Sequence, residues 1–201
     1  MNNSFLQNHH PDFPNSLDTL MVLSARKDPN ATSTQNCFLS STKNTANLQA
    51  IDFDGIRQKW YPYHRQAPQP NNVPCSVDAL LFERKGTYLI EFKSGHVEKA
   101  NLIRKIYDSI MMLIEKDNFT FDKSRKECTY IVVSNIFKPW DKRTKALAYS
   151  LAGKKNPWKE LIKRLNYDQL ELEKLEDVLV SSSYVMSSEL FELFIKFEKW
   201  K

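Results

Sequence analysis

Glycine is scarce in this 201-residue chain, and the shortage excludes the best-known phosphate-binding loops. The four glycines, Gly55, Gly86, Gly95 and Gly153, are too few and too scattered to form G-x-G-x-x-G or G-x-x-x-x-G-K-[ST]. In those loops, closely spaced glycines let backbone N–H groups surround a phosphate at the beginning of a helix. The sequence therefore contains no recognisable dinucleotide-binding or Walker-type nucleotide site.

Cysteine is equally scarce, and its residues share no C-x-x-C spacing. Cys37, Cys75 and Cys128 are odd in number and far apart, so the sequence predicts neither a disulfide framework nor a structural zinc site. This cysteine usage favours a reducing, cytoplasmic setting.

Long apolar runs are also missing. No run of about 18 apolar residues, the length that a membrane-spanning helix needs, occurs in the chain. The first fifteen residues lack the basic stretch followed by an apolar stretch that marks an export signal. We therefore expect no membrane partner and a cytoplasmic location.

The chain does have the composition of a globular domain. Hydrophobic residues make up 41% and charged residues 26%, so there is enough apolar material to bury a core, and the length fits one domain of about 100–200 residues. Residues 48–135 are predicted to form this core. Residues 1–47, rich in Asn, Ser and Thr, are predicted to be loosely ordered, with one short helix or strand at 17–23. Residues 136–201 are predicted to be a mainly helical extension packed on the core.

Strand patterns lie on both sides of one long helical pattern in the predicted core. Residues 76–83 and 87–94 are apolar or alternating, and the turn Arg84-Lys85-Gly86 between them predicts a hairpin. Residues 129–135 are a short β-branched run, typical of a buried central strand. Residues 97–116 follow a helical period, and their apolar stripe consists of Ile103, Ile106, Tyr107, Ile110, Leu113 and Ile114. The pattern indicates an α/β fold.

Helical spacing also occurs outside this part of the chain. The apolar residues of 48–61 predict a helix that precedes the hairpin. Helices are predicted at 142–153, 157–165 and 188–200, with a further strand at 177–186.

Two acids and a lysine interrupt the apolar strands of the hairpin. Glu91 and Lys93 are two residues apart, so strand geometry puts both side chains on one face. Pairing of the two strands would bring Asp78 to the same end of the sheet. Two carboxylates, together with a backbone carbonyl and waters, suit Mg²⁺ or Mn²⁺. The alternative is that Glu91 and Lys93 are a solvent-facing pair on a half-buried strand.

On these residues the sequence resembles the PD-(D/E)XK nuclease superfamily over residues 48–135. The matching pattern is Val77-Asp78 at the beginning of one strand and Glu91-Phe92-Lys93 in the next, followed by a helix and a strand. Val77 stands where the family nominally has proline, a difference that the family commonly tolerates. The resemblance implies a restriction-endonuclease-like fold, with a mixed β-sheet flanked by helices, to which the C-terminal helices are added.

The resemblance also implies an activity. Asp78 and Glu91 would be ligands of Mg²⁺ or Mn²⁺, and Lys93 would be the catalytic lysine of a phosphodiesterase that hydrolyses nucleic acid, with DNA favoured over RNA. Many proteins of this fold have lost activity, so the alternative is an inactive module that binds nucleic acid or protein. A partner-binding immunity or regulatory factor is a third interpretation.

The family's first helix often supplies a further acid. No glutamate occurs before Glu83 here, so Asp52, Asp54 or Gln58 would have to stand in. Among these three, Asp54 is a further candidate metal ligand.

Positive charge is concentrated in residues 138–164, where nine lysines and arginines are balanced by two acids. Such a segment predicts a polyanionic partner, and a solvated helix face is the alternative. A homodimer or a protein partner also stays open. The candidate nucleic-acid-binding residues are Lys105, Lys142, Arg143, Lys154, Lys155 and Lys159.

Overall fold

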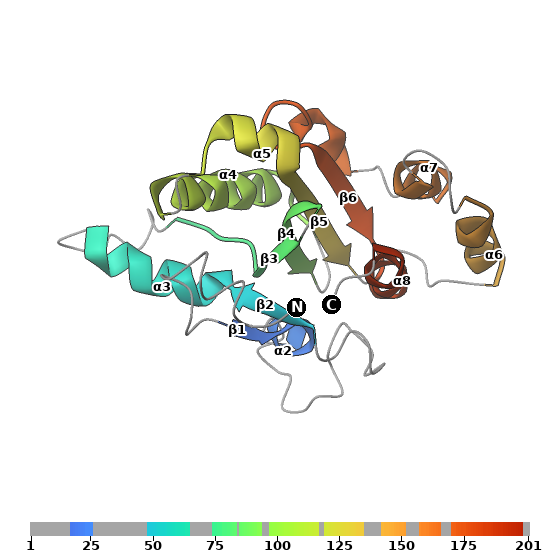
Figure 1. Ribbon diagram of the computed structural model, residues 1–201, viewed down its shortest axis with the longest axis horizontal. Coiled ribbons are helices and arrows are strands. Elements are labelled where there is room, and N and C mark those ends of the chain that lie inside the picture. The colour runs from blue at the N-terminus through green and yellow to red at the C-terminus, as the bar shows by residue number, and fades with distance from the viewer. Residues whose placement is uncertain are drawn as a thin grey trace.

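The computed structural model describes residues 17–25, 48–64, 74–83, 85–93, 97–116, 119–134, 142–151, 157–165 and 170–198. In these residues the architecture is α/β, with one mixed open sheet and helices on both of its faces (Figure 1). The strands are β1 (Leu17–Thr19), β2 (Gln49–Asp52), β3 (Ala79–Glu83), β4 (Gly86–Lys93), β5 (Cys128–Ser134) and β6 (Ser182–Met186). The helices are α2 (Leu20–Ala25), α3 (Phe53–His64), α4 (Lys99–Lys116), α5 (Phe121–Glu127), α6 (Lys142–Leu151), α7 (Pro157–Arg164), the 3-10 helix η4 (Leu172–Leu175) and α8 (Ser188–Glu198).

The strands follow one another across the sheet in chain order, from β1 to β6. Strands β1 to β4 pair antiparallel, whereas β4, β5 and β6 pair parallel. The connection from β4 to β5 runs through α4 and α5, because parallel neighbours need a crossover. Strand β5 lies between two parallel partners and is buried along almost its whole length, which confirms the central strand predicted at 129–135.

The predicted hairpin is confirmed as β3 and β4, although β3 begins at Ala79 instead of residue 76, and Gly86, predicted to be in the turn, is the first residue of β4. Its pairing runs from Ala79 opposite Ile90 to Glu83 opposite Gly86. Gly86 has φ +150°, and a Cβ built on it would lie 2.3 Å from the backbone oxygen of Glu127. Only glycine fits there, so this residue fixes where β4 begins.

Alternate residues of β4 face different helices. On one face, the ring of Phe92 packs against Phe191 of α8, with 6.1 Å between ring centroids. On the other face, Glu91 is contacted by Lys105 of α4. Helices α4 and α8 therefore cover opposite faces of the sheet (Figure 1).

The apolar stripe of α4 is largely as predicted, with one error. Ile106, Ile110 and Leu113 are buried. Tyr107 is 47% exposed, so its assignment to the stripe is wrong, and Leu102 is buried instead. Residues 102, 106, 110 and 113 follow the helical repeat of one face, whereas residue 107 is turned about 100° away from 106.

The helix predicted for residues 48–61 is wrong in its first part. Residues Gln49–Asp52 form β2, and α3 begins directly after it. Ile51 pairs with Leu17 of β1 on one side and with Leu80 of β3 on the other. The helical spacing of the apolar residues is too short a pattern to distinguish a helix from a strand. Burial between two neighbouring strands favours the strand.

The apolar stretch predicted to be one short helix or strand at 17–23 contributes to both kinds of element. It forms β1 and most of α2, and Leu20 and Leu23 are buried in the core. These residues therefore belong to the sheet and its core. The remainder of residues 1–47 lies outside the described residues.

The C-terminal part combines helices with one more strand. Helices α6, α7 and α8 match the three that were predicted. The strand predicted at 177–186 begins later, at Ser182, and β6 pairs parallel with β5. The sheet thus extends beyond residues 48–135 at both ends. No helix in the described ranges has the length and apolar character needed to cross a membrane.

Candidate functional site

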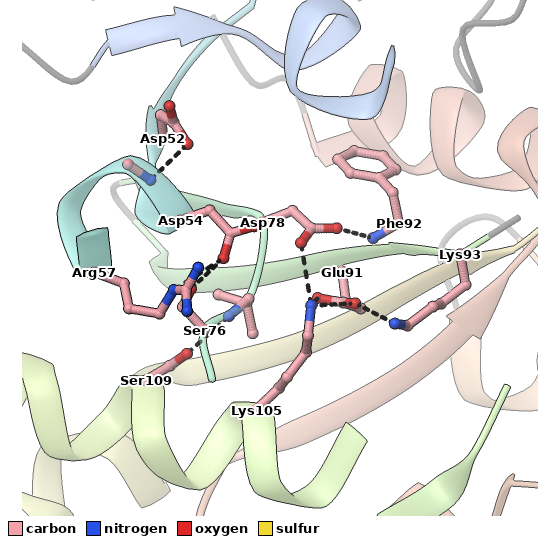
Figure 2. Close-up of polar contacts among 12 residues, drawn as sticks. Asp52, Asp54, Arg57, Ser76, Asp78, Glu91, Phe92, Lys93, Lys105 and Ser109 are labelled. Atoms are coloured by element: carbon pink, nitrogen blue, oxygen red, sulfur yellow. Dashed lines mark hydrogen bonds and ion pairs between the residues drawn. The ribbon is translucent and has the colours of Figure 1, made fainter. Parts of the chain in front are cut away.

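Asp78 and Glu91 come together at one end of the β3–β4 hairpin (Figure 2). The N–H of Asp78 donates to the carbonyl of Ile90 at 3.0 Å, which holds the residue before β3 against β4. Its own carbonyl accepts from the N–H of Phe53, the first residue of α3, at 3.2 Å. The backbone thereby fixes Asp78 beside the strand that carries Glu91, as the strand pairing predicts.

Both carboxylates are buried. Asp78 is 2% exposed and Glu91 is 0% exposed. The alternative of a solvent-facing pair is therefore wrong for Glu91, while Lys93 remains 25% exposed. Removing an isolated charge from water costs several kcal/mol, so the two acids require compensating partners.

Two lysines and a backbone amide provide this compensation. The Nζ of Lys105 lies 2.8 and 3.0 Å from the two carboxylate oxygens of Glu91 and 3.4 Å from Oδ1 of Asp78. The Nζ of Lys93 lies 3.0 Å from Oε1 of Glu91. The second oxygen of Asp78 accepts a hydrogen bond from the N–H of Phe92 at 2.7 Å. The site is thus a buried cluster in which one ammonium group contacts both carboxylates.

Lys105 reaches the cluster from the sheet-facing side of α4. One turn further along that helix, the hydroxyl of Ser109 accepts a hydrogen bond from the N–H of Val77 at 2.9 Å, which attaches α4 to the segment before β3. The side chain of Lys105 is 15% exposed. Its ammonium contacts the two acids, and the role in nucleic-acid binding predicted for it stays a prediction. Its place beside the buried Ile106 is the sequence signal that could have indicated this position.

The candidates for a further acid have other partners. Asp52 accepts a hydrogen bond from the N–H of Gly55 at 3.0 Å and so helps to begin α3. Asp54 accepts a hydrogen bond from the hydroxyl of Ser76 and lies 3.6 Å from Nε of Arg57. Gln58 is exposed. Asp54 is thus near the segment that leads to Asp78, where it contacts Ser76 and Arg57.

The residues present nevertheless fit a hard divalent cation. In the part of the chain that the structure describes, no group of three or more His, Cys, Asp and Glu side chains is arranged to hold a metal ion. Asp78 and Glu91, however, both contact the same ammonium nitrogen, so their oxygens face a common cation position. Mg²⁺ is commonly bound by one or two carboxylates, with waters completing its shell. With the ammonium of Lys105 moved out of this position, the two carboxylates would suit such an ion.

Tyr130 adds a buried polar group that the sequence pattern did not reveal. It lies on β5 opposite Leu89, so its side chain is on the same face of the sheet as Leu89 and Glu91. Its hydroxyl is buried and has no hydrogen-bond partner among the residues that the structure describes. Burial, and to a smaller extent the charge of Glu91, raise the pKa of Tyr130 well above its usual value. The hydroxyl therefore stays protonated and is available to a further polar group at the site.

Lys159, a basic residue of the C-terminal part, lies away from the carboxylates. Helix α7 packs on α8 through Trp158 and Phe194, with 5.1 Å between ring centroids, so it stands on the face opposite to the carboxylates. Lys159 forms an ion pair with Glu176. Lys142 and Arg143 begin α6. Their side chains, like the whole of Lys154 and Lys155, lie outside the described residues.

Comparisons with protein-family models, with curated proteins and with solved structures found no match. The function of the buried cluster must therefore be inferred from its own geometry and chemistry.

Proposed function

We propose that this protein is a phosphodiesterase that uses a divalent metal ion, Mg²⁺ or Mn²⁺, to hydrolyse nucleic acid, with DNA as the favoured substrate. The observation that carries the proposal is the convergence of Asp78 and Glu91 on a single cation position, with Lys93 in contact with Glu91. Burying two acids in a core costs free energy, and apolar residues of similar volume would stabilise the fold as well or better. Clusters of this kind are common at functional sites.

Each residue has a defined part in the proposed reaction. Asp78 and Glu91 would hold the ion, which when bound supplies a Lewis acid for a phosphate oxygen and lowers the pKa of an attacking water. Asp78 is held in place by the N–H of Phe92, so one of its oxygens is fixed while the other faces the cation position. Lys93 is partly exposed and would face the phosphate, where its ammonium stabilises the negative charge that develops on phosphorus.

The order of elements also supports the proposal. An acid precedes β3, the Glu-x-Lys pair lies near the end of β4, and α4 and β5 follow. This is the order that the resemblance to PD-(D/E)XK nucleases implies, and a restriction-endonuclease-like fold is part of what we propose. The substrate class rests on that resemblance and on the basic segment at 138–164.

A second candidate function has one observation in its favour. The cation between the two carboxylates is the protein's own Lys105, so the cluster is compensated without a metal ion. This arrangement suits an inactive protein of the same fold that binds nucleic acid or protein. Cleavage distinguishes the two functions.

The test is cleavage of end-labelled DNA and RNA, single-stranded and duplex, in Mg²⁺, in Mn²⁺ and in EDTA. We expect metal-dependent cleavage by the wild type and a rate lower by about 100-fold or more in Asp78→Asn, Glu91→Gln and Lys93→Met, since each removes a group that acts on the reacting phosphate. Asp122→Asn and Lys85→Met change the same chemical groups at exposed positions and should cleave normally. No cleavage by the wild type, or normal cleavage by Lys93→Met, would contradict the assignment.

A further inference from the structure

Lys105 occupies the point on which the two buried carboxylates converge. Its ammonium is within hydrogen-bond distance of both oxygens of Glu91, at 2.8 and 3.0 Å, and lies 3.4 Å from Asp78. Lys93, by comparison, approaches Glu91 from the more exposed side. Lys105 therefore stands where a cation shared by the two acids would be bound.

A divalent ion cannot bind between the two carboxylates while the ammonium of Lys105 keeps its position there. The two carboxylates and the two ammonium groups of Lys93 and Lys105 already sum to zero charge, so an added divalent ion would leave an excess of two positive charges. Mg²⁺ also needs oxygen atoms at about 2.0–2.1 Å. An ammonium nitrogen in contact with the same oxygens would then lie almost against the ion.

Two features of Lys105 are compatible with its displacement. Its charge is on a flexible four-carbon chain, and its side chain is 15% exposed, so the lysine is not fully enclosed by the fold. The backbone around the acids is held by separate contacts, from Phe92 to Asp78 and from Val77 to Ser109, that do not involve Lys105. The unpartnered hydroxyl of Tyr130 on the same face fits a site that takes a further polar group.

We infer that Lys105 is an internal counter-ion that holds the two carboxylates together in the metal-free protein and has to be displaced when a divalent ion binds. The inference rests on the proposed function, because the ion is the one that Asp78 and Glu91 would hold. Lys105 is a positioning residue that sets metal affinity. When only a fraction of molecules has the lysine displaced, the apparent dissociation constant rises by the inverse of that fraction.

The experiment is titration of the full chain with Mn²⁺ by calorimetry, followed by thermal unfolding with and without Mn²⁺. Lys105→Met removes the charge and keeps most of the side-chain volume. We expect it to tighten Mn²⁺ binding by about tenfold or more, the usual size of such coupling. Lys93→Met removes an equal charge from the edge of the cluster and should tighten binding less. Arg104→Met, at an exposed position of the same helix, should leave binding unchanged.

Thermal unfolding gives a second readout. In EDTA, Lys105→Met should melt at a lower temperature than the wild type, because two neighbouring carboxylates lose their shared counter-ion. Mn²⁺ should raise the melting temperature of Lys105→Met more than that of the wild type. Lys105→Arg keeps the charge and provides a variant that folds if Lys105→Met does not, and it should bind Mn²⁺ no more tightly than the wild type.

The outcomes separate this inference from the proposed function. If the wild type binds Mn²⁺ and cleaves, but Lys105→Met binds with equal or lower affinity, the inference alone is wrong. If Lys105→Met binds Mn²⁺ and the wild type neither binds nor cleaves, Lys105 is a counter-ion as inferred and the proposed function is wrong. Failure of both proteins to bind Mn²⁺ would overturn both.

Discussion

The two faces of strand β4 are built from different chemistry. On the face toward α8, Tyr88 and Phe92 pack edge-on against Phe194 and Phe191, with ring centroids 6.3 and 6.1 Å apart. On the face toward α4, Glu91 is buried among charged groups from α4, from β4 itself and from the residue before β3. One strand with a period of two residues thus presents an aromatic core on one side and a polar cluster on the other.

The difference separates stability from function. Aromatic burial on the α8 face stabilises the fold through area removed from water and through edge-to-face contacts. The α4 face contains two buried acids and an unpartnered tyrosine hydroxyl, none of which stabilises a domain as well as apolar residues of similar size would. We interpret the α8 face as the support and the α4 face as the site that it holds in place.

The largest effect on stability should come from the α8 face. Phe191 is fully buried, so Phe191→Ala should lower the free energy of unfolding by about 3–5 kcal/mol through lost burial and a cavity. Phe197→Ala, on the same helix at a partly buried position, should cost less. Chemical denaturation measures both. The distinction between the faces fails if Phe191→Ala costs under about 1 kcal/mol, or if the molecules that remain folded bind Mn²⁺ more weakly than the wild type.

A smaller change of opposite sign should come from the α4 face. Tyr130→Phe removes a buried hydroxyl that has no hydrogen-bond partner in the described part of the chain, so it should raise the free energy of unfolding in EDTA by about 1 kcal/mol. A loss of stability in this variant would show that the hydroxyl contributes to the fold and would weaken the contrast between the faces.

The same variant has a predicted pH dependence. Because the pKa of Tyr130 is raised in the folded protein, the unfolded chain loses the tyrosine proton first as pH rises. The free energy of unfolding is therefore unaffected by this group below about pH 10 and falls above it, by up to about 1.4 kcal/mol per pH unit. Tyr130→Phe should lose stability less steeply above pH 10. Burial also raises the pKa of Cys128 to about 12, but that thiol is common to both proteins and cancels in the comparison. Equal slopes above pH 10 would contradict the prediction.

Part of the site followed from the sequence because strand geometry is strict. Asp78, Glu91 and Lys93 could be placed at one end of the sheet from a predicted hairpin and a period of two. The register itself did not follow from the predicted three-residue turn, because Glu83 pairs with Gly86 and only two residues separate them. Gly86 strengthens the prediction, since its backbone conformation and its proximity to Glu127 admit no other residue.

The contributions of more distant segments to the site and the sheet could not be predicted from the sequence. Lys105 lies on a helix whose rotation against the sheet decides whether a lysine beside the apolar stripe faces solvent or the core. Ile51 has the spacing of a helical residue, but its burial between Leu17 and Leu80 depends on segments about 30 residues away on each side. In the sequence, nothing distinguishes Tyr130 from any other tyrosine in a β-branched run. Each of these depends on packing between elements, which local periodicity does not encode.

The most direct test of the central claim is binding of Mn²⁺ to the metal-free chain, measured by calorimetry for the wild type, Asp78→Asn, Glu91→Gln and Asp122→Asn. The claim that Asp78 and Glu91 hold the ion predicts a saturable site in the wild type and in Asp122→Asn, whose altered carboxylate is exposed. Binding should be lost or weakened by about 100-fold in the other two variants, since each removes one of the two charged ligands. Unchanged affinity in Asp78→Asn and Glu91→Gln, or no binding by the wild type, would contradict the claim.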